Sequence, residues 1–241
     1  MKVVVIIPAA GLGTRMSSAP ASKGKKAPSK QFAELGGTPI LVHTLRAFGE
    51  SPEVSEIMVA LRKNEIGGVR TWLENEGQKI VKKPVHLVEG GEHRQESVAN
   101  ALSAVKAAAD DIILVHDAVR PFVTAEIIQQ VISAAQKYGA AIAGLPAVDT
   151  IKQVERTAEV AMIKATVPRE KVVMAQTPQG FRYDIIKKAF DEAAAEGFMG
   201  TDEASLVEHT RHQVAVVMGS PRNIKITTPA DLELAEFFLK R

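Results

Sequence analysis

The sequence predicts an α/β fold of Rossmann-like type, with a mainly parallel, twisted β-sheet and helices on both of its faces. Short apolar runs rich in β-branched residues alternate with segments of helical periodicity through most of the 241 residues. The first run, residues 3–7 (VVVII), is apolar throughout, which is typical of a parallel strand buried on both faces. Neither an internal repeat nor a linker is visible, so we predict a single domain over residues 1–241.

The first half of the chain alternates strands and helices regularly. A helix is expected from Pro39 through residue 48, because proline is tolerated in the first helical turn. Residues 66–73 are also expected to be helical. The helix from about Arg94 places its apolar residues three and four apart on one core-facing stripe, formed by Val98, Ala101, Leu102 and Val105. Short apolar runs predict strands at residues 57–61, 85–88 and 112–115.

The second half follows the same rules with one interruption. Thr124 is expected to cap a helix that turns Ile127, Ile128, Val131 and Ile132 inward. Thr228, Pro229 and Asp231 supply the N-cap, first-turn proline and acidic third position of a last helix that ends near residue 240. Two more helices are expected at residues 182–196 and 202–209. Further strands are expected at residues 141–145, 214–218 and 224–226.

The interruption is a predicted β-arm at about residues 146–169. Two short β-prone pieces, residues 149–154 and 160–167, flank a polar turn at residues 155–159, which indicates a hairpin. A two-stranded hairpin is only marginally stable by itself. We therefore expect the arm to project from the sheet and to pack on a partner subunit, which predicts a homodimer.

Composition excludes several classes of function. A 46% hydrophobic and 24% charged composition is ordinary for a soluble globular protein, and a net charge of +2 argues against a general nucleic-acid binder. Cysteine is absent, which excludes disulfides, thiolate metal sites and a cysteine nucleophile. Pro8 interrupts the first apolar run, and no segment has the length of a membrane span. The sequence thus predicts a cytoplasmic protein without a membrane partner.

Residues 8–16 (PAAGLGTRM) suit a phosphate-binding turn. Small residues let the backbone approach a ligand closely, and Arg15 adds a charged donor that suits phosphate. The spacing of Gly11 and Gly13 does not match a Walker loop, and Met16 stands where the dinucleotide-binding motif has its third glycine. Residues 17–29 show no periodicity and predict a loop that Lys30 closes.

The carboxyl ends of the predicted strands bring together basic residues and one acid. These ends lie at residues 9–15, 89–92, 116–120, 145–150 and around Lys225, and open α/β sheets bind ligands there. Asp117 suits Mg²⁺, although a helix cap or an ion pair with Arg120 explains an aspartate there equally well. No nucleophile elbow occurs, and Asp202 and Glu203 are best explained as the start of a helix. The inventory predicts a Mg²⁺-dependent enzyme that acts on a nucleoside triphosphate.

Seven motifs together resemble one family. They follow in its order and approximate spacing at residues 8–16 (PAAGLGTRM), 28–32 (PSKQF), 115–121 (VHDAVRP), 149–150 (DT), 176–179 (QTPQ), 201–204 (TDEA) and 223–227 (NIKIT). The chain resembles the 2-C-methyl-D-erythritol 4-phosphate cytidylyltransferases of the non-mevalonate isoprenoid pathway over essentially its whole length. The resemblance implies transfer of CMP from CTP to the phosphate of methylerythritol phosphate, with release of pyrophosphate and a requirement for Mg²⁺.

The resemblance also implies roles for residues of these motifs. Arg15, Lys30 and Lys225 would stabilise the charge on the α-phosphorus, and Asp117 would lie beside the metal and the triphosphate. The nucleotide would be bound by Pro8, Ala9, Ala10, Gly11, Gly13, Gly91, Glu92, Ser97, Asp117 and Ala118. The polyol phosphate would be bound by Thr150, Arg169, Thr177, Lys225 and Arg120, with the arm of one subunit reaching the site of the other.

The chain departs from the family at two places, and two other functions remain open. The loop before Lys30 is longer than in many members, so Lys23, Lys25 and Lys26 have no clear counterparts. Arg222 stands at a position that is often acidic, which leaves Asp117 as the main metal ligand. The alternatives are a ribitol 5-phosphate cytidylyltransferase, which performs the same chemistry on another polyol phosphate, and a non-catalytic nucleotide-binding module.

Overall fold

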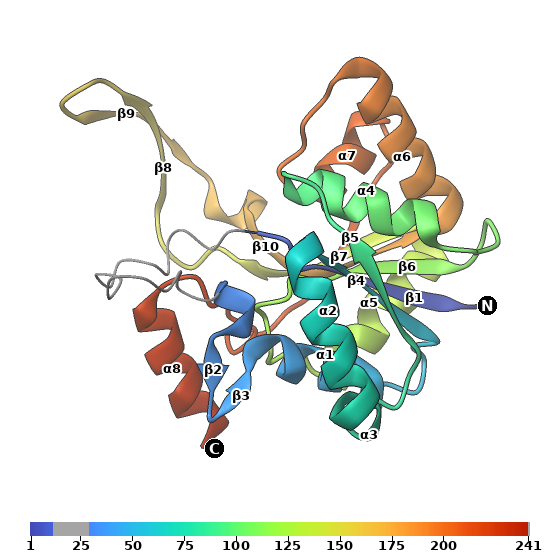
Figure 1. Ribbon diagram of the computed structural model, residues 1–241. Coiled ribbons are helices and arrows are strands. Elements are labelled where there is room, and N and C mark those ends of the chain that lie inside the picture. Colours follow the sequence, from blue (N-terminus) through green and yellow to red (C-terminus); the bar gives the residue numbers. More distant parts are fainter. Residues whose placement is uncertain (12–28, 241) are drawn as a thin grey trace.

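A seven-stranded sheet forms the centre of the protein in the computed structural model, which describes residues 1–11 and 29–240 (Figure 1). The strands lie in the order β11-β7-β10-β6-β1-β4-β5. Within this sheet, β10 runs antiparallel to both neighbours and the other pairings are parallel. The strands are β1 (Val3–Pro8), β4 (Glu56–Leu61), β5 (Val85–Glu89), β6 (Ile112–Val115), β7 (Ala140–Pro146), β10 (Val173–Arg182) and β11 (Ala215–Met218). The predicted α/β fold class is confirmed.

Helices cover both faces of this sheet, as Figure 1 shows. One face is covered by α1 (Ile40–Glu50), α2 (Lys63–Trp72) and α5 (Ala125–Tyr138). The other is covered by α4 (Arg94–Ala104), α6 (Tyr183–Glu196) and α7 (Glu203–His209). Successive residues of β1 point to opposite faces, so Val5 and Ile7 join one core and Val4 and Ile6 join the other. Two buried faces explain why the first strand has no polar residue.

The helix ends follow the predicted capping chemistry. The Thr124 hydroxyl accepts a hydrogen bond from the backbone N–H of Ile127 at the start of α5. The last helix, α8 (Pro229–Leu239), begins after Thr228, whose hydroxyl accepts from the N–H of Asp231. The predicted apolar stripe of α4 is buried against the sheet. Local signals in the sequence therefore place these helices correctly.

Two sequence-based predictions of secondary structure are wrong. The sequence pattern predicts no strand at residues 173–182, yet they form β10 between β6 and β7. It predicts a strand at residues 224–226, but these residues pair with no strand of the described chain. Ile226 is buried in a third, smaller core with Leu35, Ile40, Val119 and Ala235, and its N–H donates to the carbonyl of Val119.

Several short elements complete the described chain. A 3₁₀ turn (Lys30–Phe32) leads into a small hairpin of β2 (Glu34–Leu35) and β3 (Thr38–Pro39). Helix α2 continues through a π-helical turn (Leu73–Gly77) into α3 (Gln78–Ile80), so this helical region is longer than predicted. In the described part of the chain, no helix is both long and apolar enough to cross a membrane.

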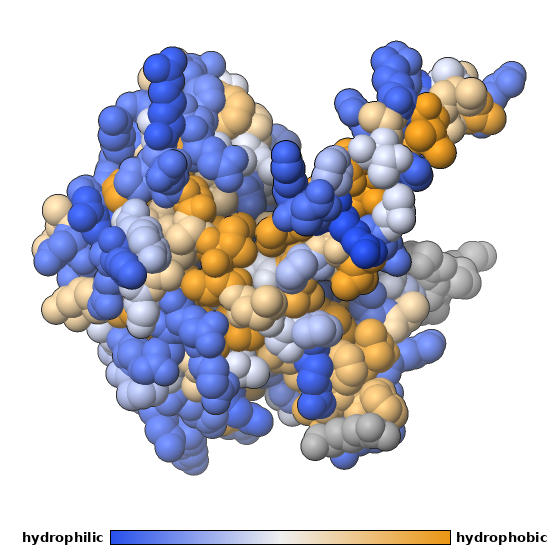
Figure 2. Space-filling view, turned by 180° about the vertical axis from the view of Figure 1, so that it is seen from behind, coloured by the Kyte–Doolittle hydropathy of each residue, from blue (hydrophilic) through white to orange (hydrophobic). Residues whose placement is uncertain are grey.

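The predicted arm is present as an antiparallel hairpin of β8 (Ile151–Arg156) and β9 (Ala161–Val167). It projects away from the sheet in Figure 1, and its two strands pair with each other. Val154, Met162 and Ile163 on the arm are exposed. Exposed apolar side chains continue at its base with Val148, Val173 and Met174, and Figure 2 shows apolar surface extending from the arm to the body.

Candidate active site

A cavity lies where the predicted strand ends meet, at the carboxyl edge of β1, β5 and β6. Its walls come from the turn after β1, the turn that leads from β5 into α4, and the turn after β6. Residues 30–31 and Lys225 close the remaining sides. The lining residues are Pro8, Ala9, Ala10, Gly11, Lys30, Gln31, Gly91, Glu92, His93, Arg94, Ser97, Asp117, Ala118, Val119 and Lys225.

The end of β1 is fixed by contacts from both sides. The N–H of Ala9 donates to the carbonyl of Ala60 at 2.7 Å, which extends the ladder with β4. The amide of Gln31, which is buried, donates to the carbonyl of Ala9 at 2.5 Å. Gln31 therefore ties the segment that carries Lys30 to the floor of the cavity.

The turn between β5 and α4 is held by its own side chains. The N–H of Gly91 donates to the Ser97 hydroxyl at 3.1 Å, and the N–H of Glu92 donates to the Glu96 carboxylate at 2.8 Å. A Cβ at Gly91 would lie 2.3 Å from the Cβ of Glu96, so the position accepts glycine alone in this conformation. The result is a rigid backbone turn, which suits recognition of a base or ribose through main-chain groups.

Asp117 stands at the centre of a cluster of cations. One carboxylate oxygen lies 3.3 Å from Nε of Arg94, and the other lies 3.0 Å from Nζ of Lys225 and 3.2 Å from Nε of Arg120. Burial alone would raise the pKa of Asp117, but the three cations outweigh it and hold this pKa well below its usual range. Asp117 is therefore a carboxylate at neutral pH. The ion pair with Arg120, one of the alternatives left open by the sequence, is present.

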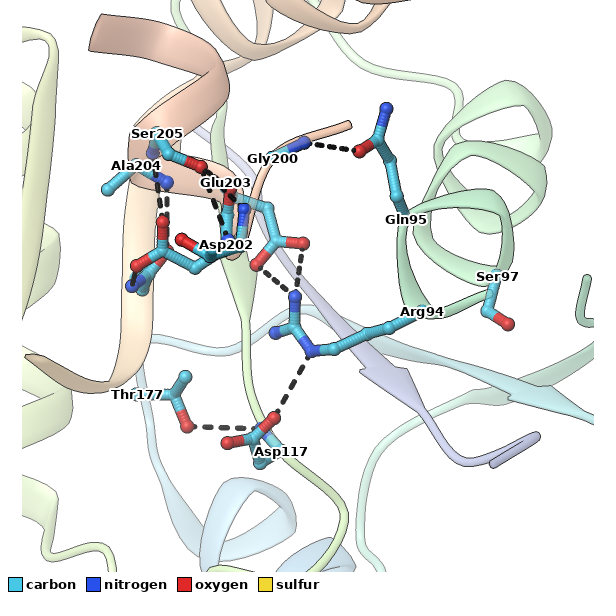
Figure 3. Close-up of polar contacts among 12 residues, drawn as sticks. Arg94, Gln95, Ser97, Asp117, Thr177, Gly200, Asp202, Glu203, Ala204 and Ser205 are labelled. Carbon is cyan, nitrogen blue, oxygen red and sulfur yellow. Dashed lines mark hydrogen bonds and ion pairs between the residues drawn. The ribbon is translucent and has the colours of Figure 1, made fainter. Parts of the chain in front are cut away.

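Arg94 bridges Asp117 to a second buried carboxylate, as Figure 3 shows. Nη1 of Arg94 donates to both oxygens of Glu203, at 2.6 and 2.9 Å. Burial would lower the pKa of Arg94, but the two carboxylates raise it further above its ordinary value. Burial raises the pKa of Glu203 and outweighs the attraction of Arg94, which is the cation that the described residues pair with it.

The turn after β6 is braced beneath Asp117. His116 is fully buried, its Nε2 lies 3.0 Å from the carbonyl of Arg120, and its ring meets Phe48 edge-on at 4.8 Å. Burial lowers the pKa of His116 to about 4, so its imidazole is neutral. The hydroxyl of Thr44 on α1 donates to the carbonyl of Ala118 at 2.9 Å.

Thr177 on β10 and Asn223 connect the far side of the cluster. The N–H of Asp117 donates to the Thr177 hydroxyl at 3.0 Å, and the amide of Asn223 donates to the Thr177 carbonyl at 2.8 Å. Nη1 of Arg120 donates to the carbonyl of Asn223 at 2.7 Å. Arg120 is thus held between Asp117 and Asn223. The Thr177 hydroxyl oxygen thus accepts from Asp117 at the edge of the cluster.

The structure brings most of the sequence-predicted nucleotide residues into one cavity. Lys30 and Lys225 line it together with Asp117, and Thr177 and Arg120 contact Asp117 from behind. Thr150 and Arg169 lie exposed at the arm, where Nη1 of Arg169 donates to the carbonyl of Val148. Gly13, Arg15, Lys23, Lys25 and Lys26 lie outside the described residues, and so does most of the predicted loop.

Sequence reasoning missed five residues of this site. Gln31, His93, Arg94 and Val119 line the cavity, and Glu203 contacts it through Arg94. The position of Arg94 just past a strand end was a usable signal, since the same edge supplied the predicted residues. Glu203 gave no such signal, because its partner lies 109 positions away in the chain.

The described residues contain no group of three or more His, Cys, Asp or Glu side chains that could hold a metal ion. Arg222, at the position where the family often has an acid, is directed toward α8. Its Nη2 donates to the carbonyl of Phe238, and its guanidinium lies 5.1 Å from the centre of that ring. Asp117 therefore stands without a second carboxylate from this position.

Comparison with known proteins gives one consistent result. The family model for 2-C-methyl-D-erythritol 4-phosphate cytidylyltransferase matches residues 3–241. Curated proteins of that name from Acidobacterium capsulatum and Solibacter usitatus are 56% and 52% identical over the whole chain, covering 98% and 96% of their own lengths. A crystal structure of that name from Thermus thermophilus is 34% identical, with a TM-score of 0.76 and full coverage of both chains. The 4-diphosphocytidyl-2C-methyl-D-erythritol synthase structure from Anaerococcus prevotii has a TM-score of 0.82 at 29% identity and covers 100% of this chain and 99% of its own.

Proposed function

This chain belongs to the 2-C-methyl-D-erythritol 4-phosphate cytidylyltransferase family, and we propose that the cavity around Asp117 is where it transfers CMP from CTP to 2-C-methyl-D-erythritol 4-phosphate. The observation that carries the assignment is that Lys30, Asp117 and Lys225 line one cavity together with the rigid turns after β1 and β5. These turns offer backbone groups to the cytosine and ribose, and the cations face the phosphates.

The reaction needs positioning and charge stabilisation more than a covalent nucleophile. A phosphate oxygen of the polyol phosphate forms a bond to the α-phosphorus of CTP, and the bond to the bridging oxygen of pyrophosphate breaks on the opposite side. Negative charge on the α-phosphoryl oxygens is greatest in the transition state. Lys30 and Lys225 stabilise it there, and Arg15 adds a guanidinium from the segment outside the described residues.

Mg²⁺ fits the donor chemistry of this site. Mg²⁺ prefers hard oxygen ligands and usually takes one or two protein carboxylates together with substrate phosphates. Asp117 is ionised, and it lines the cavity that we assign to the nucleotide, so it would hold the ion with the triphosphate. When bound, Mg²⁺ would supply positive charge to the phosphates of the nucleotide. Chelation is expected to abolish turnover, and Asp117→Asn is expected to raise the Mg²⁺ concentration for half-maximal rate.

The arm completes the second substrate site in a homodimer. Thr150 and Arg169 are carried by the arm and its base and do not line the cavity of their own chain within the described residues. Exposed Met162 and Ile163 on the arm offer apolar surface to a second copy. We propose that Arg169 and Thr150 of one subunit bind the polyol phosphate beside Thr177 and Lys225 of the other.

Subunit complementation tests this arrangement. Lys225→Ala is expected to be nearly inactive, and so is Arg169→Ala when the polyol phosphate is held at a concentration below the wild-type KM. When the two variants are mixed and reassembled, half of the dimers carry one intact site, so about a quarter of the wild-type activity is expected to return. Failure of the mixture to regain activity, with mixed dimers demonstrated by mass spectrometry, would refute arm exchange.

Pyrophosphate release tests the function itself. We expect turnover with CTP and 2-C-methyl-D-erythritol 4-phosphate, and little turnover with ATP, GTP or UTP. A preference for ribitol 5-phosphate would assign the chain to the sister reaction. CTP binding measured by calorimetry without turnover on either polyol phosphate would indicate a non-catalytic module.

A further inference from the structure

Glu203 is a buried carboxylate for which the proposed mechanism has no role. Its side chain is 1% exposed at the first position of α7. The sequence explains an acidic residue here as part of the start of a helix. In the structure, however, Asp202 caps this helix by accepting a hydrogen bond from the N–H of Ser205. Glu203 instead directs both oxygens at Nη1 of Arg94 (Figure 3). A buried charge is costly unless it is paired, so this pair requires an explanation.

Arg94 is shared unequally between two carboxylates. Its contacts with Glu203 are 2.6 and 2.9 Å, whereas its single contact with Asp117 is 3.3 Å, through Nε. An arginine facing one carboxylate alone favours two parallel N–H···O bonds. The short contacts to Glu203 hold the guanidinium in an orientation that denies Asp117 this paired geometry.

We propose that Glu203 is a positioning residue of the nucleotide site, which holds Arg94 away from a two-bond pair with Asp117 and so keeps the Asp117 carboxylate presented to the cavity. Without the charge of Glu203, the guanidinium of Arg94 turns to Asp117 and forms a two-bond pair with its carboxylate. The present single contact, at 3.3 Å, would then be replaced by a closer one that withdraws the carboxylate from the cavity. The inference rests on the proposed role of Asp117 at the nucleotide phosphates, and it extends that role to a residue outside the cavity lining.

The backbone around this pair is held independently of Glu203. The side-chain amide of Gln95, next to Arg94, donates to the carbonyl of Phe198 and accepts from the N–H of Gly200, both at 3.0 Å. Gln179 on β10 donates to Asp202 and accepts from the N–H of Ala204. The start of α4 and the start of α7 therefore stay docked when the charge of Glu203 is removed. A change in activity then reports on Arg94 and not on the docking of α7.

A double-mutant cycle tests the proposal. Glu203→Gln, Arg94→Gln and the double variant are compared with wild type by kcat and KM for CTP, by calorimetric CTP affinity and by melting temperature. Glu208→Gln, an exposed glutamate on the same helix, is the matched control. We expect Glu203→Gln to lower kcat/KM for CTP by about 10–100-fold, as for other residues that orient a ligand-binding group, and the control to stay within about twofold. The double variant is expected to match Arg94→Gln, since Glu203 acts through Arg94.

Two results would overturn the proposal. One is a Glu203→Gln enzyme with wild-type kcat/KM. The other is a double variant whose loss equals the product of the two single losses, which would mean that Glu203 acts without Arg94. If Glu203→Gln shows no cooperative unfolding, Arg94→Lys replaces it. Lysine keeps the buried charge of Glu203 paired, but it cannot contact both carboxylates as the fork of an arginine does. We therefore expect Arg94→Lys to lower kcat/KM for CTP by about tenfold, and a wild-type kcat/KM would contradict the proposal.

The same assays separate this inference from the proposed function. If the wild-type protein released no pyrophosphate, the proposed function would be refuted. The inference about Glu203 could then still be tested by calorimetry, because Glu203→Gln must bind CTP more weakly than wild type. A wild-type rate in Asp117→Asn would refute the role of Asp117 on which the inference rests.

Discussion

The buried imidazole of His116 makes the site sensitive to acid. His116 is fully buried, and Phe48 faces its ring. Its charged neighbours are Asp117, whose carboxylate favours the protonated ring, and Arg120 and Arg94, which oppose it. Burial dominates and lowers the pKa from 6.5 in the unfolded chain to about 4 in the folded protein. Protonation therefore favours the unfolded state over the interval between these two values.

The sign and size of the effect follow from linkage. Above about pH 7 both states are neutral at this position and His116 contributes nothing to the pH dependence. As the pH falls below 6.5 the unfolded chain takes up a proton that the folded protein does not, so stability decreases until the folded pKa of about 4 is reached. With about 1.4 kcal/mol per pH unit, the full loss is about 3 kcal/mol, of which most has occurred by about pH 4.5.

Urea unfolding of wild type and His116→Gln at about pH 7.5 and pH 4.5 measures this loss. Glutamine retains a donor for the carbonyl of Arg120 and does not titrate. The free energy of unfolding of wild type is expected to fall by about 2–3 kcal/mol more than that of the variant between the two pH values. All carboxylates and the other histidines are present in both proteins, so their contributions to the pH dependence cancel in the difference. Equal losses in the two proteins, or an NMR titration of the His116 ring near its ordinary pKa, would refute the argument.

Three further predictions concern catalysis and packing. Arg15→Ala is expected to lower kcat by about 10²–10³-fold, the size typical of one oxyanion-type donor, and a nearly unchanged kcat removes Arg15 from the catalytic residues. Arg169→Ala is expected to raise KM for the polyol phosphate and to leave the calorimetric affinity for CTP intact; weaker CTP binding would show that the arm has been assigned to the wrong substrate. A Cβ at Gly180 would lie 2.7 Å from Val131 and 2.9 Å from Leu114, so Gly180→Ala is expected to lower the free energy of unfolding by about 1–3 kcal/mol. Gly67→Ala, at an exposed helical position with open space, serves as its control and is expected to raise it by about 0.5–1 kcal/mol in the same urea titration.

Local signals account for most of the fold that sequence could predict. Unbroken apolar runs locate the central parallel strands, because strands buried on both faces need no polar residue. Capping residues locate the helix starts, since they satisfy donors that the helix itself leaves unpaired. The arm was predictable because its polar turn interrupts the alternation of strand and helix.

Strand β10 was not predictable because the rules of local propensity argue against it. Pro178 and Gly180 are both unfavourable inside a central strand. Gly180 is nonetheless required there, because α5 packs so closely over this strand. The register with β7 shifts between Ala175 and Gln179, so Pro178 lies outside the regular pairing. The strand is polar because Gln176, Thr177 and Gln179 bond to the segments around the site.

The opposite error at residues 224–226 has the same origin. The alternation of Ile224, Lys225 and Ile226 is the pattern of a half-buried strand, and Ile226 is buried as that pattern predicts, whereas Ile224 and Lys225 are both partly buried. Within residues 1–11 and 29–240, however, no strand pairs with this segment, and a backbone bond from Ile226 to Val119 holds it where Lys225 contacts Asp117. A sequence pattern can thus reveal which side chains are buried without revealing what the backbone pairs with.

The charge balance of the site explains why binding of a nucleoside triphosphate would need Mg²⁺ and Arg15 in addition to the residues that line the described cavity. Arg94, Arg120 and Lys225 stand against Asp117 and Glu203, a net charge of +1 within the cluster. Lys30 and Glu92, which also line the cavity, leave that balance unchanged. A nucleoside triphosphate carries about four negative charges near neutral pH, so this cluster alone neutralises a small part of them. Mg²⁺ and Arg15 together would add three positive charges and bring the balance close to zero. Under our proposal, most of the positive charge that balances the triphosphate would therefore come from Mg²⁺ and Arg15, and not from the cluster around Asp117.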